Sequence, residues 1–365
     1  MRRMFRPSQP KRRLRRSRLA GVMVTVLAAA TLWAADAPLG PSPSRAPPRS
    51  GKPSAAPEAK SPPASRMDWR TDLDAALKEA AASDRLVLIY FRADWCQPCL
   101  LMENGTFARP GFVKYLAERF VPLKADDTAE PGAASKKYGV RAYPSLLFLS
   151  STGEALHMVV GPQTAPQLHA IMERVLGLVK VLAAQKQAPD DLEANFAVGS
   201  AYVGLDHLRR AEPYLQRACE LDPKNEHGRL SQARLLLAVV PVEDGDSALA
   251  LKNLAAYMEE FKDSPEIPAA IFFRGEILFG DAKMDPEKLL EARQVFDALR
   301  TQFPKHVKAY EADRAIDVID ARLRAVKPAA GKKEPEPAAP PAAPPTPPPS
   351  KEAPAIRAPG VFTGG

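Results

Sequence analysis

The stretch Leu86-Val87-Leu88-Ile89-Tyr90-Phe91-Arg92-Ala93-Asp94-Trp95-Cys96-Gln97-Pro98-Cys99 decides the fold of this 365-residue chain. Its first six residues form an apolar run rich in β-branched and aromatic side chains, which is typical of a buried strand. A short loop and two cysteines follow that run. This order predicts a strand over 86–91 and then a helix whose first turn holds Cys96.

The position of Cys96 favours thiol chemistry. A thiolate, not a thiol, is the nucleophile, and the unpaired backbone N–H groups and dipole at the start of a helix stabilise a thiolate. Cys99 lies one helical turn further on. It can therefore attack a mixed disulfide formed at Cys96 and release the substrate.

Zinc binding is the alternative reading of this cysteine spacing. A structural zinc site needs about four ligands, usually supplied by a second such pair of cysteines or by a pair of histidines. The chain has one other cysteine, Cys219, and none of its five histidines forms such a pair. The sequence therefore favours redox chemistry, and it predicts neither a metal nor an organic cofactor.

Several further motifs follow in the order found in one family. They are Ala93 to Cys99, Glu103, Thr106-Phe107, Pro110, Tyr138-Gly139-Val140-Arg141-Ala142-Tyr143-Pro144-Ser145, the apolar run 146–149, a turn at Thr152-Gly153, and Gly161. Together they make residues 67–180, about a third of the chain, resemble a thioredoxin-fold domain. The closest resemblance is to the C-terminal thioredoxin-like domain of the Dsb-type periplasmic thiol:disulfide interchange protein. It implies an α/β fold with a central mixed sheet flanked by helices.

The resemblance also implies a role for each residue of the motif. Cys96 is the attacking nucleophile and Cys99 the resolving thiol, with Pro98 between them. Trp95 covers the disulfide with an apolar face. Tyr143 and Pro144 lie beside the sulfurs, where a cis Pro144 lets the backbone of Tyr143 pair with an extended substrate. An ordinary trans loop proline is the alternative reading of Pro144.

The chain departs from the thioredoxin pattern at one informative position. Many thioredoxins keep a buried aspartate six residues before the nucleophile as a proton acceptor, and this chain has Tyr90 there. A phenol with a pKa near 10 is a poor base at neutral pH. Glu103 and Asp94 are therefore the candidate proton relay to Cys99, and a solvated helix or loop face is the alternative for both.

Charge is concentrated at the N-terminus. The formal net charge of the chain is +8, and residues 1–37, with nine Lys or Arg and one Asp, account for it. The remaining basic and acidic residues cancel. The sequence therefore predicts no nucleic-acid partner.

Residues 1–37 are predicted to be an export or membrane signal. Their basic start precedes an apolar stretch, Leu19–Ala35, which has no charged residue. Such a pattern is a cleaved signal peptide or an uncleaved membrane anchor, and seventeen residues is the lower limit for spanning a bilayer. In both cases the body is expected in the bacterial periplasm or cell envelope, and residues 19–35 contact the membrane if they stay uncleaved.

Two proline-rich segments are predicted not to fold. Residues 38–65 carry nine prolines and read as a linker, and residues 327–365 carry twelve and read as a Pro/Ala-rich tail. Such segments are extended and solvated, partly as polyproline II.

Residues 186–326 are predicted to be tetratricopeptide-like helical repeats. One repeat is strong, with its pattern at Gly199, Tyr202, Ala211, Leu215, Ala218 and Pro223. Another shows Gly275, Leu278, Ala292, Phe296, Leu299 and Pro304, with a connection near Asp281–Glu287 that is longer than the family standard. The unit at 226–265 between them is degenerate, because Ala233 and Leu236 fit but its second half matches poorly. The repeats are expected to pack against the thioredoxin-like domain, residues 66–185, through a helix over 165–185.

Taken together, these features predict an exported or membrane-tethered thiol:disulfide oxidoreductase that reduces or exchanges disulfides in envelope proteins through Cys96 and Cys99. Its predicted partners are protein dithiols or disulfides, a membrane electron donor, and a protein bound on the repeats. The direction of electron flow stays open. The alternative is a non-catalytic envelope adaptor that acts through its repeats, with the cysteine pair as a passive disulfide.

Overall fold

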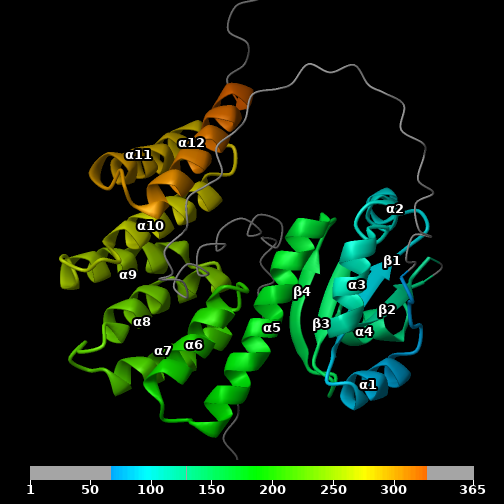
Figure 1. Cartoon of the computed structure of the whole chain (residues 1–365). Coiled ribbons are helices and arrows are strands. Elements are labelled where there is room, and N and C mark those ends of the chain that lie inside the picture. The colour runs from blue at the N-terminus through cyan, green and yellow to red at the C-terminus, as the bar shows by residue number, and fades with distance from the viewer. Residues whose placement is uncertain (1–66, 129, 327–365) are drawn as a thin grey trace, which may run out of the picture.

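The computed structural model describes residues 67–128 and 130–326 (Figure 1). The first part of this range alternates helices and strands. Its elements are α1 Leu73–Ala82, β1 Leu86–Arg92, α2 Gln97–Asn104, α3 Pro110–Arg119, β2 Phe120–Asp126, α4 Ala133–Tyr138, β3 Ser145–Leu149, β4 Ala155–Val160 and α5 Ala165–Gln187. The strand predicted over 86–91 is confirmed and continues for one more residue.

The four strands form one mixed sheet in the order β2-β1-β3-β4. β1 pairs in parallel with β2 and antiparallel with β3, which pairs antiparallel with β4. All seven residues of β1 are buried, as a strand covered on both faces requires. The predicted α/β thioredoxin fold is confirmed.

The two faces of the sheet are covered by different helices. One face, with Val87, Ile89 and Phe91, packs against α1 and α4. The opposite face, with Leu88 and Tyr90, packs against α2, α3 and α5. The alternation along β1 follows from the two-residue period of a strand. It places α2, and with it both cysteines, on the same face as α5.

The second part of the chain is entirely helical (Figure 1). Its α-helices are α6 Leu192–Val203, α7 Leu208–Leu221, α8 Arg229–Ala238, α9 Ser247–Glu260, α10 Ile267–Ala282, α11 Pro286–Gln302 and α12 Val307–Val326, with a short 3₁₀ helix, η3, at Val240–Asp244. They form three successive pairs, α6–α7, α8–α9 and α10–α11, and α12 packs against the last pair. The predicted tetratricopeptide-like arrangement is confirmed.

Glycine lets two of the pairs approach closely. A Cβ atom added to Gly199 on α6 would lie 2.6 Å from Cγ and Cδ2 of Leu215 on α7. One added to Gly275 on α10 would lie 2.7 Å from ring carbons of Phe296 on α11. Real Cβ contacts are longer than this, so a side chain at either position would force the facing side chain to shift. The small residues of the repeat pattern therefore act as predicted.

Two details of the predicted repeats are wrong. The connection between α10 and α11 is short, spanning residues 283–285, because the extra residues of this repeat lengthen both of its helices instead. The second half of the middle unit also keeps the repeat pattern. Its α9 buries a residue trio at the same spacing as α7 and α11, and all nine are at most 3% exposed: Ala211, Leu215 and Ala218; Ala250, Leu254 and Tyr257; Ala292, Phe296 and Leu299.

Helix α5 joins the two parts, as expected from the sequence. Its buried residues Leu168, Met172, Val175 and Leu178 belong to one hydrophobic cluster that runs from the sheet into the helical array. Polar contacts reinforce the junction. Nδ1 of His157 on β4 lies 3.1 Å from Nε2 of His207, and Arg210 donates to the carbonyl of Ala155 at 3.1 Å.

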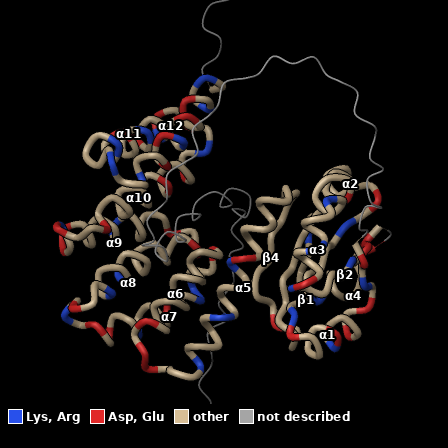
Figure 2. Tube along the Cα trace, in the orientation of Figure 1, with Lys and Arg blue, Asp and Glu red and all other residues tan. Residues whose placement is uncertain are grey.

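Charged residues of both signs are intermixed over the two parts (Figure 2). Many of them form ion pairs between helices, such as Arg229 with Glu193 at 2.7 Å and Arg293 with Asp320 at 2.7 Å. Within the described residues, no helix is both long and apolar enough to cross a membrane. The predicted signal or anchor at 1–37, the linker at 38–65 and the tail at 327–365 lie outside the described residues.

Candidate active site

The cysteine pair lies where β1 passes into α2. Cys96 is the N-cap of α2, one position before the first turn predicted for it, and Pro98 is in that first turn, where its missing N–H leaves no helical bond unmade. Cys96 and Cys99 are joined by a disulfide, with their Cα atoms 5.3 Å apart. The site is therefore the oxidised form of a dithiol at a helix N-terminus.

Backbone hydrogen bonds hold Cys96 at the start of α2. The N–H of Cys99 lies 3.2 Å from Sγ of Cys96 and donates to it, and the N–H of Cys96 donates to the carbonyl of Ala93 at 3.0 Å. Cys99 is fully buried, whereas Cys96 is 3% exposed. Cys96 is thus the cysteine nearer to solvent. After reduction, the N–H of Cys99 is placed to stabilise the thiolate of Cys96.

Trp95, directly before Cys96, contacts the loop before β3. Trp95 is 66% exposed, and its ring meets the ring of Tyr143 edge-on, with centroids 5.7 Å apart. The Tyr143–Pro144 bond is cis, in agreement with the family resemblance. The carbonyl of Pro144 accepts a hydrogen bond from Gly161 at 2.8 Å. The structure thus brings Trp95 and Tyr143 together from positions far apart in the sequence.

Asp127 supports this loop and was not predicted from the sequence. Its Oδ2 accepts hydrogen bonds from the Tyr143 hydroxyl at 3.0 Å and from Ser135, and its Oδ1 accepts from the N–H of Gly132 at 2.7 Å. Burial and the bond to Asp127 raise the pKa of Tyr143 to about 12. A buried acid directly after β2 is a weak sequence signal, because Asp126 beside it is an equally good candidate.

Tyr90 lies beneath α2 as the sequence comparison with thioredoxins implies. Its hydroxyl donates to the carbonyl of Cys99 at 3.0 Å. Burial raises its pKa, and the negative charge of Glu103 adds to the effect. A phenol in this state supports the helix and has no capacity to accept a proton from Cys99 near neutral pH.

The two carboxylates of the candidate proton relay both face Arg92. Asp94 is exposed and pairs with the Arg92 guanidinium. Glu103 lies one turn after Cys99 on α2 and is about three-quarters buried, with its Oε1 3.1 Å from Nε of Arg92 and 3.2 Å from Nζ of Lys124. Their role in proton transfer stays a prediction. Helical spacing puts Glu103, and not Asp94, on the face of α2 that carries Cys99.

Cys219 lies apart from this site, on α7. It is half-buried, and burial raises the pKa of its thiol. A thiol with a raised pKa is a poor nucleophile. Among the described residues, no three His, Cys, Asp or Glu side chains form a group that could hold a metal ion.

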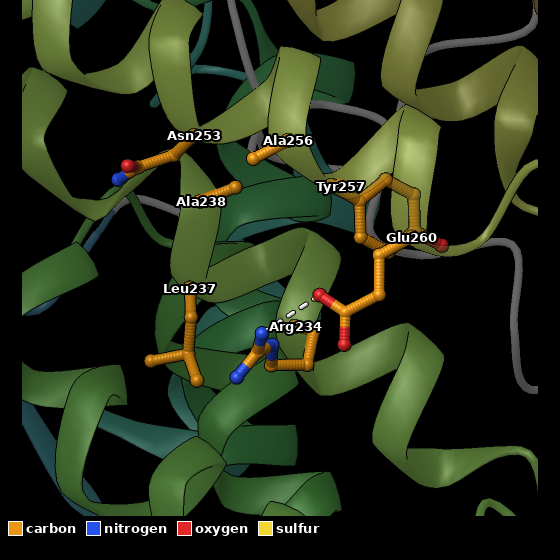
Figure 3. A pocket seen from close by; sticks show the side chains of 7 residues that line it. All are labelled: Arg234, Leu237, Ala238, Asn253, Ala256, Tyr257 and Glu260. Carbon is orange, nitrogen blue, oxygen red and sulfur yellow. Dashed lines mark hydrogen bonds and ion pairs between the residues drawn. The ribbon is translucent and has the colours of Figure 1, made fainter.

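A hollow of about 250 Å³ opens between α8 and α9 (Figure 3). An ion pair between Arg234 and Glu260, 2.8 Å apart, lies across it. The hollow is lined by Arg234, Leu237, Ala238, Asn253, Ala256, Tyr257 and Glu260. It belongs to the middle repeat and not to the disulfide site, so it is a surface feature of the helical array.

Comparisons with known proteins agree with this geometry. The sequence model of a family described as Thioredoxin-like matches residues 68–151, which include both cysteines and Pro144. The chain is 33% identical over 127 residues to a thiol:disulfide interchange protein DsbD of Ralstonia nicotianae, covering 34% of this chain and 21% of that protein. It is 33% identical over 109 residues to a Thioredoxin H-type of Oryza sativa subsp. indica, covering 29% of this chain and 82% of that protein.

A third relative combines the two modules in its name. The TPR repeat-containing thioredoxin TDX of Oryza sativa subsp. japonica is 36% identical over 93 residues, which cover 25% of this chain and 27% of that protein. The chain thus spans only about a fifth of the DsbD relative and about a quarter of TDX, but most of the thioredoxin.

Proposed function

Because the chain belongs to the thioredoxin family through residues 68–151, we propose that it is a thiol:disulfide oxidoreductase that acts on protein disulfides. The observation that carries the proposal is the Cys96–Cys99 pair at the N-terminus of α2, with the nucleophile candidate nearer to solvent. Both cysteines, Trp95 and Pro144 are present together, as an exchange site needs and a passive scaffold does not.

The reaction is two successive exchanges. The Cys96 thiolate attacks one sulfur of a substrate disulfide, so that a Cys96–substrate bond forms and the first substrate thiolate leaves. Cys99 then loses its proton and attacks Sγ of Cys96, which forms the disulfide and releases the second substrate thiolate. The substrate gains two electrons, which the dithiol loses, and protons from water or a carboxylate such as Glu103 complete the balance.

The cell envelope is the proposed place of action. The basic residues before the apolar stretch Leu19–Ala35 support export of the body to an oxidising compartment. There a reductant needs electrons from a membrane donor, so such a donor is part of the proposal. Fractionation of cells that express the full chain tests it, because a body found in the cytoplasm would refute the export.

A second candidate is an adaptor that binds a protein through the helical array. The hollow between α8 and α9 and the tetratricopeptide-like pairing favour it. In that case the Cys96–Cys99 disulfide is a structural bond that does not exchange with thiols. The two candidates differ in whether the disulfide exchanges with thiols in solution.

The deciding experiment measures the reduction potential of Cys96–Cys99 in the full chain, equilibrated with glutathione or dithiothreitol buffers. The Cys219→Ser variant serves as the control, because it leaves two titrating cysteines. A potential near about −270 mV supports a reductant fed by a donor, and one near about −120 mV makes the protein an oxidant.

Trapping of substrate provides an independent readout. The Cys99→Ser variant is expected to accumulate a mixed disulfide at Cys96, whereas Cys96→Ser and Cys219→Ser are not. A disulfide that resists both buffers, or a Cys99→Ser variant that traps no partner, would refute the enzyme and leave the adaptor.

A further inference from the structure

Arg92 is a buried charge directly before the active-site loop. It ends β1, and its residue is only 6% exposed. Although burial opposes ionisation, hydrogen bonds to Asp94 and Asp126 and the charge of Glu103 raise the pKa of Arg92. A buried guanidinium requires carboxylate partners, because an unpaired buried charge is strongly destabilising. Three such partners surround Arg92, and each comes from a different element.

The first two partners tie the Cys96 loop to the neighbouring strand. Nη1 of Arg92 pairs with Asp94 in the loop and lies 2.7 Å from Oδ2 of Asp126 at the end of β2. Thr128 completes the connection, since its hydroxyl donates to Asp126 and accepts the N–H of Asp94 at 2.9 Å. The loop that carries Trp95 and Cys96 is therefore fixed through side chains as well as through backbone.

The third partner is the carboxylate of Glu103. Its Oε1 lies between two cations, Nε of Arg92 at 3.1 Å and Nζ of Lys124 at 3.2 Å. Nε of Arg92 is buried and makes no hydrogen bond within the described residues, so this contact is electrostatic. Both contacts use Oε1, and among the described residues Oε2 of Glu103 takes part in no hydrogen bond or ion pair.

The charges around Arg92 nearly balance. Asp94, Glu103 and Asp126 contribute three negative charges, against the positive charges of Arg92 and Lys124. Loss of Arg92 would leave one cation among three anions, close to the helix that bears both cysteines. Excess negative charge disfavours a neighbouring thiolate.

We propose that Arg92 is a positioning residue of the dithiol site, which holds the Cys96 loop through Asp94 and the Glu103 carboxylate on α2, and thereby sustains the thiolate form of the reduced enzyme. This rests on the proposed oxidoreductase function. Arg92 touches neither sulfur, so it acts through Asp94, Glu103 and its charge.

The test is the pH dependence of alkylation of the reduced dithiol by iodoacetamide, measured in the full chain with Cys219→Ser as the parent. Arg92→Gln is expected to move the midpoint about one unit to higher pH, which lowers the rate at a pH below both midpoints about tenfold. Arg92→Lys keeps the charge, so its pH midpoint is expected to lie close to that of the parent.

Arg85→Gln is the matched control. Arg85 lies just before the other end of β1, is partly buried, and pairs with a carboxylate, Glu79, at 2.7 Å. It is expected to lower the thermal midpoint without moving the pH midpoint. Asp126→Asn makes the opposite change of charge at the exposed end of β2, so it is expected to move the pH midpoint down. This variant decides the matter if Arg92→Gln does not fold.

The outcomes separate the two proposals. A parent that shows no disulfide exchange overturns the proposed function, whatever Arg92 does. An exchange-competent parent whose pH midpoint is unmoved by both Arg92→Gln and Asp126→Asn overturns the role of Arg92, even if thermal stability falls.

Discussion

Replacement of Gly275 by alanine tests the packing of the last helix pair directly. Gly275 lies in α10, and an added Cβ would lie 2.7 Å from Cε1 and Cζ and 3.0 Å from Cδ1 of Phe296. Comfortable carbon–carbon contacts are about 3.5–4.0 Å, so the new methyl group would be roughly 1 Å too close. Phe296 is fully buried and packs against Phe272, with ring centroids 5.5 Å apart, so its ring has no free space to enter.

The size of the effect follows from two opposing contributions. Overpacking of a well-packed core destabilises by about 1–3 kcal/mol. Alanine gains up to about 1 kcal/mol over glycine in a helix. Gly280 lies on the same helix, and an added Cβ there meets nothing within 4 Å. Gly280→Ala therefore gains the helix propensity of alanine without any overpacking. Gly275→Ala is expected to be less stable than Gly280→Ala by about 1–3 kcal/mol.

Urea unfolding of the full chain, followed by circular dichroism at 222 nm, provides the comparison. Phe296→Leu removes the ring atoms Cε1 and Cζ, so Gly275→Ala is expected to be less destabilising in that background than in the wild type. If Gly275→Ala stabilises the protein as much as Gly280→Ala does, α10 and α11 do not pack as described and the reasoning is wrong.

Two further predictions concern buried polar groups. Burial, together with the charge of Glu311 and against that of Lys308, raises the pKa of Glu276 on α10 to about 8. The folded state then holds a proton that the unfolded chain loses above about 4.5, so wild-type stability falls as pH rises from about 4.5 to 8. In thermal melts, the midpoint of Glu276→Gln should rise relative to that of the wild type as pH increases across this range. Midpoints of the two proteins that vary in parallel with pH would contradict the prediction. Tyr143→Phe removes the hydrogen bond to Asp127 but keeps the ring against Trp95, so stability should fall by about 1 kcal/mol and alkylation of Cys96 should change little. Tyr143→Ala loses both the hydrogen bond and the ring contact, so it should change both stability and the alkylation of Cys96. Equal effects of Tyr143→Phe and Tyr143→Ala would refute the assignment of separate roles to the hydroxyl and the ring.

The sequence alone determined the local units of this protein. The apolar run 86–91 followed by two cysteines predicted β1, the loop and α2, because a buried strand and a helix start have short-range patterns. The trio Ala211, Leu215 and Ala218 predicted α7 as the second helix of a repeat for the same reason. The degenerate middle repeat was misjudged, since the extra residues of η3 hid the same trio further along the chain.

Only the tertiary structure decided which distant residues meet. Arg92 meets Asp126 because parallel pairing of β1 with β2 brings the ends of these strands together. Tyr143 meets Asp127 because β3, which begins two residues after Tyr143, pairs with the opposite edge of β1. Neither pair has a sequence pattern, since each is separated by 16 or 34 residues whose path through space depends on the whole fold. The sequence thus names the two cysteines, whereas the side chains that hold their loop in place become visible only when the sheet has formed.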